Sequence, residues 1–285
     1  MVERLLALEA SSSERDGDVV QTIALLYHDI VPAGEYSLSG FQSADANIYK
    51  LDCDEFKSHL REIARAATQP PRDASDAIEL AWTRLLLTFD DGGVSAILYV
   101  AELLEGFGWR GHFFITTGRI GTSGFLDESQ IRRLHDNGHV IGSHSCSHPA
   151  RMSYCSPEQL DHEWGESTRV LTRILGAPVT TASVPGGYYS RRVATAAARF
   201  GIRVLFTSEP VASSHIVDGC VVLGRFSVQQ GVPREWVASL VSGHVIPRFR
   251  QYLFWNCKKI LKVVGGEAWL SVRRKILAHR LKLNG

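Results

Sequence analysis

Short apolar stretches alternate with amphipathic segments along most of the chain. The apolar stretches have the length of buried strands, while the segments between them carry apolar residues at the three- and four-residue spacing of a helix face. Ile97, Val100 and Leu104, for example, lie on one face of a predicted helix. Regular alternation of strand and helix predicts a parallel sheet covered by helices. The predicted strands are residues 22–27, 85–89, 112–115, 139–142, 180–184, 203–206 and 221–226.

Local signals fix the ends of several predicted helices. Ser156 and Pro157 form a start signal, because serine caps a helix N-terminus and proline suits its first turn, while Gly176 is a stop signal. Residues 68–76, with two prolines, read as a loop. The predicted helices are a short one before residue 11 and residues 52–67, 94–104, 156–175, 191–200, 233–241, 249–264 and 267–283.

Two carboxylates and two histidines follow two of the predicted strands. Asp90 and Asp91 come directly after residues 85–89, and His144 and His148 come after residues 139–142. Parallel strands that end at one edge of a sheet bring such side chains together. Two imidazoles and one carboxylate form a common catalytic site for a divalent metal, with positions open for water and substrate. The second carboxylate is then free to act as a general base.

These residues resemble two motifs of the polysaccharide deacetylase family, the NodB-type carbohydrate esterases. The first motif, T-F-D-D-G, stands at residues 88–92, and the second, H-[ST]-x-x-H, stands at residues 144–148. The resemblance covers roughly residues 20 to 230 and implies a distorted (β/α)7 barrel, in agreement with the seven predicted strands. We therefore expect an N-terminal helix and loop at 1–18, the barrel at 19–230, and a basic, aromatic-rich helical extension packed on the barrel at 231–285.

The resemblance assigns roles to the motif residues. It implies that Asp91, His144 and His148 bind the metal and that Asp90 is the catalytic base. Imidazole and carboxylate ligands suit Zn²⁺ best among the candidates, with Co²⁺, Ni²⁺ or Fe²⁺ as alternatives. Cys146, between the two histidines, occupies a variable position of the motif and is not expected to be a ligand.

The general acid has two candidates in the sequence. Most of the family carries a histidine after an apolar strand near the C-terminal end of the barrel, and no histidine stands in that place here: His244, the alternative, follows a predicted helix. His28, at the end of strand 22–27, is the better candidate. It resembles a circularly permuted arrangement found in deacetylases of surface poly-N-acetylglucosamine. Asp29 would then orient the loop or the imidazole.

The third motif departs from the family pattern, in which R-x-P precedes an aromatic residue. Ser183 replaces that arginine, so the cation that normally pairs with the catalytic aspartate is missing there and its pKa should differ. Arg225 could supply the charge from another strand end, and we group it with Gly186 and Tyr188 as substrate- and oxyanion-binding residues. The Gly186 N–H would stabilise an oxyanion, and Tyr188 would stack on a sugar or pack in the core. Glu209 is the only candidate for the acid of the fourth motif.

The combined motifs favour a metal-dependent deacetylase of an N-acetylated sugar, acting on a polysaccharide or a lipid-linked saccharide precursor. The departures at Ser183 and Gly187 leave open a non-sugar amide or ester substrate at the same metal site. The missing arginine also leaves open a catalytically inactive, carbohydrate-binding relative.

Charge and cysteine content refine this interpretation. The formal net charge of +1 gives no global attraction to nucleic acid. Residues 248–285, however, carry ten Lys or Arg residues and a single acid, which predicts either a packed helical tail with a solvated basic face or contact with anionic membrane. Five cysteines without scaffold-like spacing favour reduced thiols. With no secretory signal visible, we expect a cytoplasmic enzyme, in part associated with the inner face of the membrane.

Overall fold

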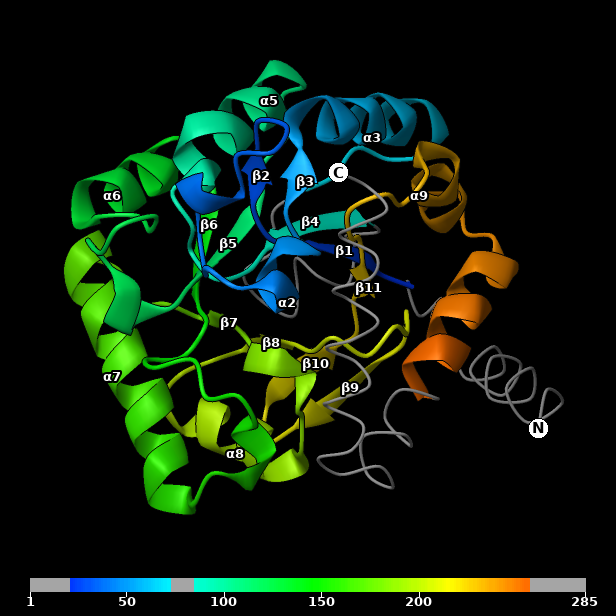
Figure 1. Ribbon diagram of the computed structural model, residues 1–285. Helices are drawn as coiled ribbons and strands as arrows, with labels where there is room; N and C mark the ends of the chain where they lie inside the picture. Colours follow the sequence, from blue (N-terminus) through cyan, green and yellow to red (C-terminus); the bar gives the residue numbers. More distant parts are fainter. Residues whose placement is uncertain (1–20, 73–84, 257–285) are drawn as a thin grey trace, which may run out of the picture.

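The computed structural model describes residues 21–72 and 85–256 and contains a curled, mostly parallel sheet surrounded by helices (Figure 1). The sheet has nine strands in the order β11-β1-β4-β5-β6-β7-β8-β10-β9, and only the β10–β9 pair is antiparallel. A separate parallel pair joins β2 and β3. The strands are β1 Ile23–Tyr27, β2 Ile30–Val31, β3 Leu51–Asp52, β4 Leu85–Phe89, β5 His112–Ile115, β6 Val140–Ser143, β7 Thr181–Ser183, β8 Val204–Phe206, β9 Ser214–Val217, β10 Cys220–Leu223 and β11 Phe226–Ser227.

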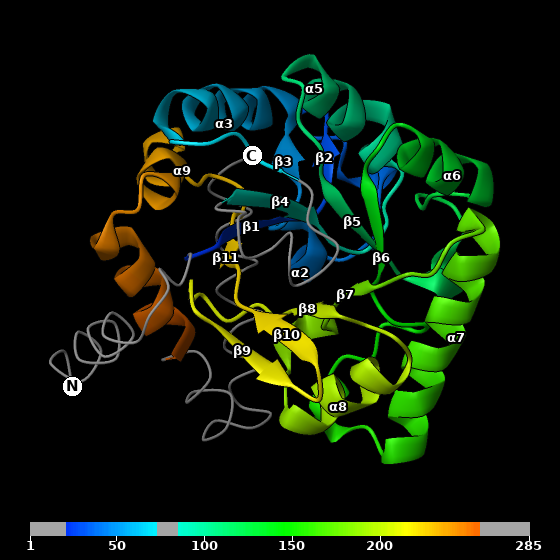
Figure 2. The same cartoon turned by 180° about the vertical axis from the view of Figure 1, so that it is seen from behind.

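The predicted barrel is confirmed, and it is distorted. Each of the seven predicted strands is present within a few residues of its expected bounds, while β2, β3, β9 and β11 are additional. In the described part of the chain no ladder joins β9 to β11, so the curled sheet stays open between them. Seen from the opposite side, the helices form an outer layer around the strands (Figure 2).

The helices follow their local sequence signals. In α7, Ser156 and Gln159 form a reciprocal capping box, Pro157 occupies the first turn, and Gly176 ends the helix with a φ of 68°. The segment expected as one helix at 94–104 contains a π-type turn at Ala96–Val100 that continues into α5. The helices are α2 Ala44–Asn47, α3 Cys53–Ala66, α5 Ala101–Gly106, α6 Glu128–Asp136, α7 Pro157–Leu175, α8 Arg191–Arg199 and α9 Arg234–Val241.

Alternate residues of the strands face two different parts of the core. Leu25 and Leu87 pack toward the surrounding helices in the larger cluster. Leu86, Phe114 and Phe206 belong to a separate cluster built from strand residues alone. Because successive side chains of a strand point to opposite faces, every second residue fills the interior of the barrel, as in other (β/α) barrels. The functional groups are then carried at the strand ends.

Beyond the barrel, α9 packs against α3. Val237 and Leu240 of α9 share a buried cluster with Leu60 and Ile63 of α3. Residues 245–256 are helical, whereas the remainder of the expected basic extension and the expected N-terminal helix lie outside the described residues. The proposed division at residue 230 stays a prediction.

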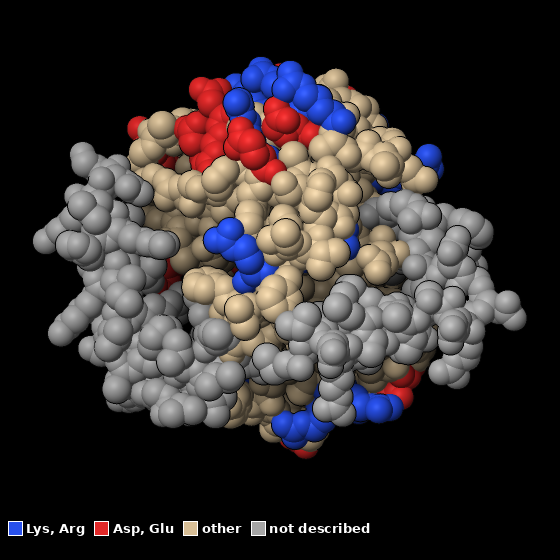
Figure 3. Space-filling view, turned by 90° about the vertical axis from the view of Figure 1, so that its right-hand side faces the viewer, with Lys and Arg blue, Asp and Glu red and all other residues tan. Residues whose placement is uncertain are grey.

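On the face shown in Figure 3, acidic and basic side chains lie together at the top, at the level of α3, and most of the remaining coloured surface is uncharged. Within residues 21–72 and 85–256, no helix combines the length and apolar character that a membrane-spanning segment needs.

Candidate active site

Strand register brings the motif residues to one edge of the sheet. Tyr27 of β1 lies opposite Phe89 of β4, so His28 and Asp90 follow at neighbouring positions. The backbone N–H of Asp90 donates to the Tyr27 carbonyl at 3.1 Å. The N–H of His144 donates in the same way to the last residue of β5, Ile115, at 2.9 Å. Side chains separated by more than a hundred residues therefore meet at the carboxyl ends of parallel strands.

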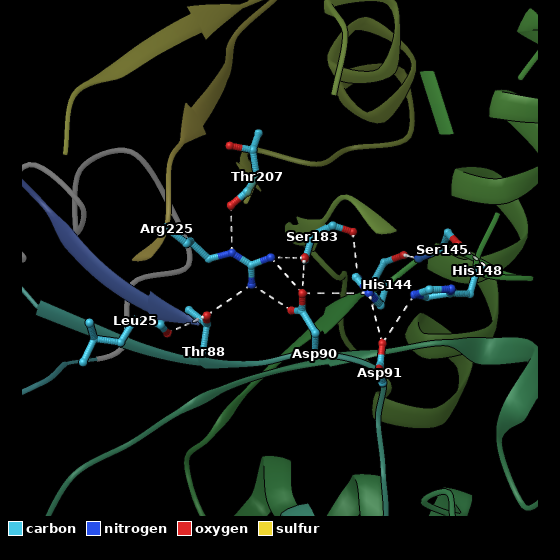
Figure 4. A network of polar contacts seen from close by, with 11 residues as sticks. Leu25, Thr88, Asp90, Asp91, His144, Ser145, His148, Ser183, Thr207 and Arg225 are labelled. Atoms are coloured by element: carbon cyan, nitrogen blue, oxygen red, sulfur yellow. Dashed lines mark hydrogen bonds and ion pairs between the residues drawn. The ribbon is translucent and has the colours of Figure 1, made fainter. Parts of the chain in front are cut away.

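Asp91, His144 and His148 form a compact set of metal-ligating atoms (Figure 4). Their ligand atoms all lie within 4.8 Å of one another, and Asp91 Oδ1 is 3.4 Å from Nε2 of each histidine. His144 Nδ1 is 3.0 Å from the carbonyl oxygen of Ser183, which can only accept, so Nδ1 carries the proton. Nε2 of His144 is then left with its lone pair toward Asp91, as a metal ligand requires. This donor set fits a divalent metal.

The backbone at this set adopts left-handed conformations. Asp91, Ser145 and His148 have φ values of 77°, 63° and 60°, which residues other than glycine rarely adopt. Each such residue costs on the order of 1–3 kcal/mol, and such strain is characteristic of functional sites. Ser145 compensates locally, because its N–H donates to Ser143 Oγ and its Oγ accepts from the N–H of His148, both at 3.1 Å.

Glu163 of α7 holds the loop between the two histidines from beneath. Its Oε2 accepts from the N–H groups of Cys146 and Ser147 at 2.9 and 2.8 Å, and its Oε1 accepts from Ser147 Oγ at 2.5 Å. Glu163 is buried, so these contacts replace its lost hydration. Cys146 is not part of the ligand set, and burial raises the pKa of its thiol. We did not predict Glu163, although an acid on the otherwise buried face of an amphipathic helix is a recognisable signal.

Arg225 lies beside Asp90 and is completely buried (Figure 4). Its Nη1 and Nη2 donate to the two carboxylate oxygens of Asp90 at 2.7 and 2.8 Å, a bidentate pair. The remaining N–H groups donate to Thr88 Oγ1 at 3.1 Å, Ser183 Oγ at 2.7 Å and the Thr207 carbonyl at 2.9 Å. All five donors of the guanidinium are thus occupied by protein acceptors.

This arrangement explains the unusual third motif. The cation beside Asp90 is Arg225, which follows the end of β10. The family pattern would place an arginine at the end of β7, where this chain has Ser183. The charge therefore comes from another strand end, as we expected. The grouping of Arg225 with substrate- and oxyanion-binding residues does not hold, because it is buried and has no N–H left for a ligand. Ser183 contributes directly, since its Oγ donates to Asp90 Oδ2 at 3.1 Å.

Electrostatics keeps both carboxyls ionised. Burial would raise the pKa of Asp90, but the charge and hydrogen bonds of the Arg225 guanidinium outweigh that effect and hold this pKa below its ordinary value. Burial likewise opposes ionisation of Asp91, yet the contacts with His144 and His148 lower its pKa well below the ordinary value. The pKa of His148 is raised, because the bond to Asp91 outweighs the effect of burial.

His28 lies beside the carboxylates, with Tyr49 against its ring at a centroid distance of 4.6 Å. Its Nδ1 is buried and has no hydrogen-bond partner in the described part of the chain. Burial lowers the pKa of His28, and the charges of Asp91 and Asp90 partly offset this. His244, the alternative acid, is exposed just beyond α9. The geometry favours His28.

Asp29 anchors the segment that follows His28. Its Oδ1 accepts from Ser39 Oγ at 2.5 Å and from Ser95 Oγ at 2.8 Å, and burial raises its pKa. Gly93 and Gly40 pass so close that a β-carbon on either would overlap the Asp29 carboxylate. Asp29 therefore acts on the loop, one of the two roles we expected.

The remaining predicted residues differ in position. Gly186 is exposed in a 3₁₀ turn at Pro185–Gly187 and has a φ of 64°. Tyr188 is half-buried beside it, so it is not a core residue. The backbone carbonyl of Glu209 accepts from the backbone N–H of Arg225. Among the described residues, no hydrogen bond joins the Glu209 carboxylate to His28. Two further histidines lie within the fold: His112 is buried in β5, and His139 accepts through Nδ1 from the N–H of Gly111.

Comparison with known proteins agrees with this geometry. The family model of polysaccharide deacetylases matches residues 81–205, which contain both motifs and the Ser183 turn. This chain contains a polysaccharide deacetylase domain. YxkH of Bacillus subtilis, whose own assignment as a polysaccharide deacetylase is provisional, is 25% identical over 214 residues. That match covers 73% of this chain and 71% of YxkH.

Solved structures share the fold of the deacetylase domain. The deacetylase PplD of Streptococcus pyogenes, solved with acetate, superposes with a TM-score of 0.63 at 19% identity over 76% of this chain and 96% of that one. A Bacillus cereus polysaccharide deacetylase gives 0.65 at 17% identity, covering 77% and 68%. IcaB of Ammonifex degensii gives 0.61 at 19% identity, covering 78% and 97%. At these identities the likeness concerns the fold.

Proposed function

We propose that this protein is a metal-dependent deacetylase that hydrolyses the acetamido group of an N-acetylated glycan and releases acetate. The observation that carries the proposal is the juxtaposition of two groups of side chains. Asp91, His144 and His148 form a set suited to a divalent ion, and the Asp90–Arg225 pair lies next to it, with Asp90 Oδ2 3.9 Å from His144 Nε2. A hydrolase acting on an amide needs both an electrophilic centre and a base, and these two groups supply them.

Asp91, His144 and His148 would hold the metal, and Zn²⁺ fits two imidazoles and one carboxylate best, with Co²⁺, Ni²⁺ and Fe²⁺ as alternatives. When bound, the ion would polarise the amide carbonyl and lower the pKa of water. Asp90 is ionised and held in place by Arg225, so it accepts the proton of the attacking water. The Gly186 N–H would stabilise the negative charge that develops on the carbonyl oxygen.

His28 completes the reaction by protonating the leaving nitrogen. Cleavage of the C–N bond requires a proton on the amine, and His28 lies beside the carboxylates with an Nδ1 that has no hydrogen-bond partner among the described residues. The products are acetate and the free amino sugar, so water is the only co-reactant.

The substrate is an N-acetylated sugar of a polysaccharide or a lipid-linked precursor. The match to the polysaccharide deacetylase family model supports the glycan, and two aromatic rings near the site, the exposed Tyr154 and the half-buried Tyr188, suit a sugar face. The departure at Ser183 had left a non-sugar amide or an inactive relative open. Because Arg225 supplies the cation that the third motif lacks, the serine at position 183 no longer argues for either alternative.

Acetate release tests the proposal. Metal-stripped protein would be assayed on N-acetylglucosamine oligomers with and without added Zn²⁺ or Co²⁺, beside Asp90→Asn and His28→Ala. His162→Ala is the matched control, since His162 is exposed on α7. We expect release that depends on the metal and falls by about 10²-fold or more in both site variants.

Two results would contradict the assignment. Equal release with and without metal would remove the role of Asp91 and the histidines. Full activity of His28→Ala would move the acid role to His244 or to water.

We also propose that the basic C-terminal region meets anionic membrane at the cytoplasmic face. Ten basic residues and one acid in 248–285 support this. Sedimentation with vesicles containing anionic lipid, compared with neutral vesicles, tests it, and equal binding to both would refute it.

A further inference from the structure

One exposed arginine at the edge of the site is held in place by aromatic rings. Arg151 follows His148 by three residues, and its Cζ lies 5.7 Å from the ring centroid of Tyr154 and 5.8 Å from that of Tyr188. Tyr154 is 71% exposed, and Arg151 is exposed as well. Contacts with ring faces orient a guanidinium while leaving its N–H edge available.

Arg151 is connected to the catalytic residues by direct packing. A β-carbon built on Gly186 would lie 3.0 Å from the Ala150 carbonyl and 3.6 Å from Cδ2 of Tyr188. The oxyanion candidate Gly186, the segment after His148 and the ring beneath Arg151 are thus in contact. Arg192 adds rigidity, because its Nη2 donates to the Ser153 carbonyl at 3.2 Å and ties this turn to α8.

A second exposed arginine lies beside the metal-ligand set. The Cζ of Arg119 is 5.3 Å from the ring centroid of Phe41, and the Phe41 ring is 4.8 Å from that of His148. The N–H of Gly118 donates to the Cys146 carbonyl at 2.8 Å, which fixes the Arg119 turn to the loop between the histidines.

Three exposed arginines on α7 and α8 already have acid partners. Arg169, Arg173 and Arg199 each pair with a carboxylate at 2.5–2.6 Å. Across residues 21–72 and 85–256, neither Arg119 nor Arg151 forms an ion pair. Guanidinium groups that are oriented but have no acid partner suit an oxyanion, which they bind through paired N–H groups.

We propose that Arg151, assisted by Arg119, binds an anionic group on the glycan, adjacent to the acetamido sugar that is hydrolysed. This inference rests on the proposed function and narrows its substrate class to acidic glycans. The shared chemistry is an oxyanion, which is either the carboxylate of a neighbouring uronate or a phosphate on the sugar.

Matched substrates test the subsite. An N-acetylglucosamine trimer, an acetylated oligosaccharide of similar length with a uronate neighbour, and an N-acetyl sugar 1-phosphate would be compared by kcat/KM. We expect one of the anionic substrates to exceed the neutral trimer at least tenfold, and the preferred one identifies the source of the anion. This preference should fall to about twofold in Arg151→Gln, through KM, and weaken at high salt. It should persist in Arg169→Gln, the control on α7.

A binding measurement separates this inference from the proposed function. Metal-free protein would be titrated calorimetrically with the same compounds, without hydrolysis. Tighter binding of an anionic compound, lost in Arg151→Gln, would support the subsite even if acetate were never released. Equal affinity for neutral and anionic compounds, or a preference that survives Arg151→Gln, would overturn it.

Discussion

Replacing Arg225 by methionine should cost both stability and activity, because it removes five hydrogen bonds and a buried charge at once. Asp90 has a side chain only 4% exposed and pairs with the guanidinium through both oxygens. Breaking one partner of a buried ion pair typically costs about 3–5 kcal/mol. We expect a loss of that size in the free energy of unfolding, measured by urea denaturation at pH 7. Arg199→Met, which removes an exposed pair with Asp161, should cost about 1 kcal/mol or less.

The stability difference between the wild type and Arg225→Met should depend on pH in a direction that follows from the pKa of Asp90. In the wild type the pKa of Asp90 lies below its unfolded value of 3.8, so its ionisation stabilises the fold above that value and the contribution is lost as pH falls through the folded pKa. Without Arg225, burial remains and raises the pKa of Asp90. The variant should therefore gain stability relative to the wild type as pH falls from 7, and the acidic limb of its kcat/KM profile should move to higher pH. At neutral pH we expect kcat/KM to fall about 10²-fold, within the range of general-base contributions.

Two further variants sharpen the test. Arg225→Lys offers three donors for five acceptors, so its stability and activity should lie between those of wild type and Arg225→Met. In the double variant Ser183→Arg/Arg225→Ala, the cation returns to the third-motif position and should restore part of the activity lost in Arg225→Ala. A stability change within 1 kcal/mol for Arg225→Met, or an unshifted pH profile, would refute the view that this pair keeps the base ionised.

Three other predictions address the metal loop, the barrel interior and the metal itself. Glu163→Gln should weaken Zn²⁺ affinity about 10-fold in a competition assay, since an amide cannot accept from all three loop donors. Glu166→Gln, at a half-buried position of the same helix that pairs with Arg169, should leave the affinity unchanged, and equal affinities of the two variants would contradict the role of Glu163. Burial and nearby positive charges lower the pKa of His112 to about 3, so between pH 6.5 and 3 the unfolded chain binds a proton that the folded chain does not. The free energy of unfolding of the wild type should therefore fall by about 2 kcal/mol more than that of His112→Phe between pH 7 and 5, and equal losses in urea denaturation would count against this. Chelation should lower the melting temperature, and Zn²⁺ at a hundredfold excess over its Kd should restore about 2.7 kcal/mol of the free energy of unfolding. An unchanged melting temperature would exclude a metal bound to the folded protein.

Most of the barrel was predictable because its strands are fully buried. Leu85–Phe89 and His112–Ile115 are short apolar runs, and parallel strands covered on both faces take that form. The strands that escaped prediction are the short β2, β3 and β11 and the edge strand β9. In β9, Ser214, His215 and Ile216 are exposed, so no buried pattern marks it. Pairing with β10 decides its structure, and that contact is non-local.

The site was predictable where spacing along the chain carries the chemistry. The ligand set at Asp91, His144 and His148 follows from two local motifs, and His28 follows from its place at a strand end. Glu163 was not predicted: its place on the otherwise buried face of α7 marks it as unusual, but nothing in its spacing along the sequence points to its partners, two backbone N–H groups and the Ser147 hydroxyl. Only the fold shows that an acid on α7 faces the loop between the histidines.

The cation beside Asp90 illustrates how one requirement of the chemistry can be met from different strands. Nη2 of Arg225 lies 2.7 Å from Ser183 Oγ, so an arginine reaching Asp90 from the end of β10 leaves room for only a small side chain at position 183. The two positions are coupled: a large cation at one requires a small residue at the other. Examined through its third motif alone, the chain lacks a catalytic residue. In the folded structure, the Asp90 carboxylate retains a bidentate guanidinium partner, Arg225, and the Ser183 hydroxyl donates a further hydrogen bond to the same carboxylate. Loss of a motif residue therefore argues for loss of activity only after the other side chains that could fill the same position have been excluded.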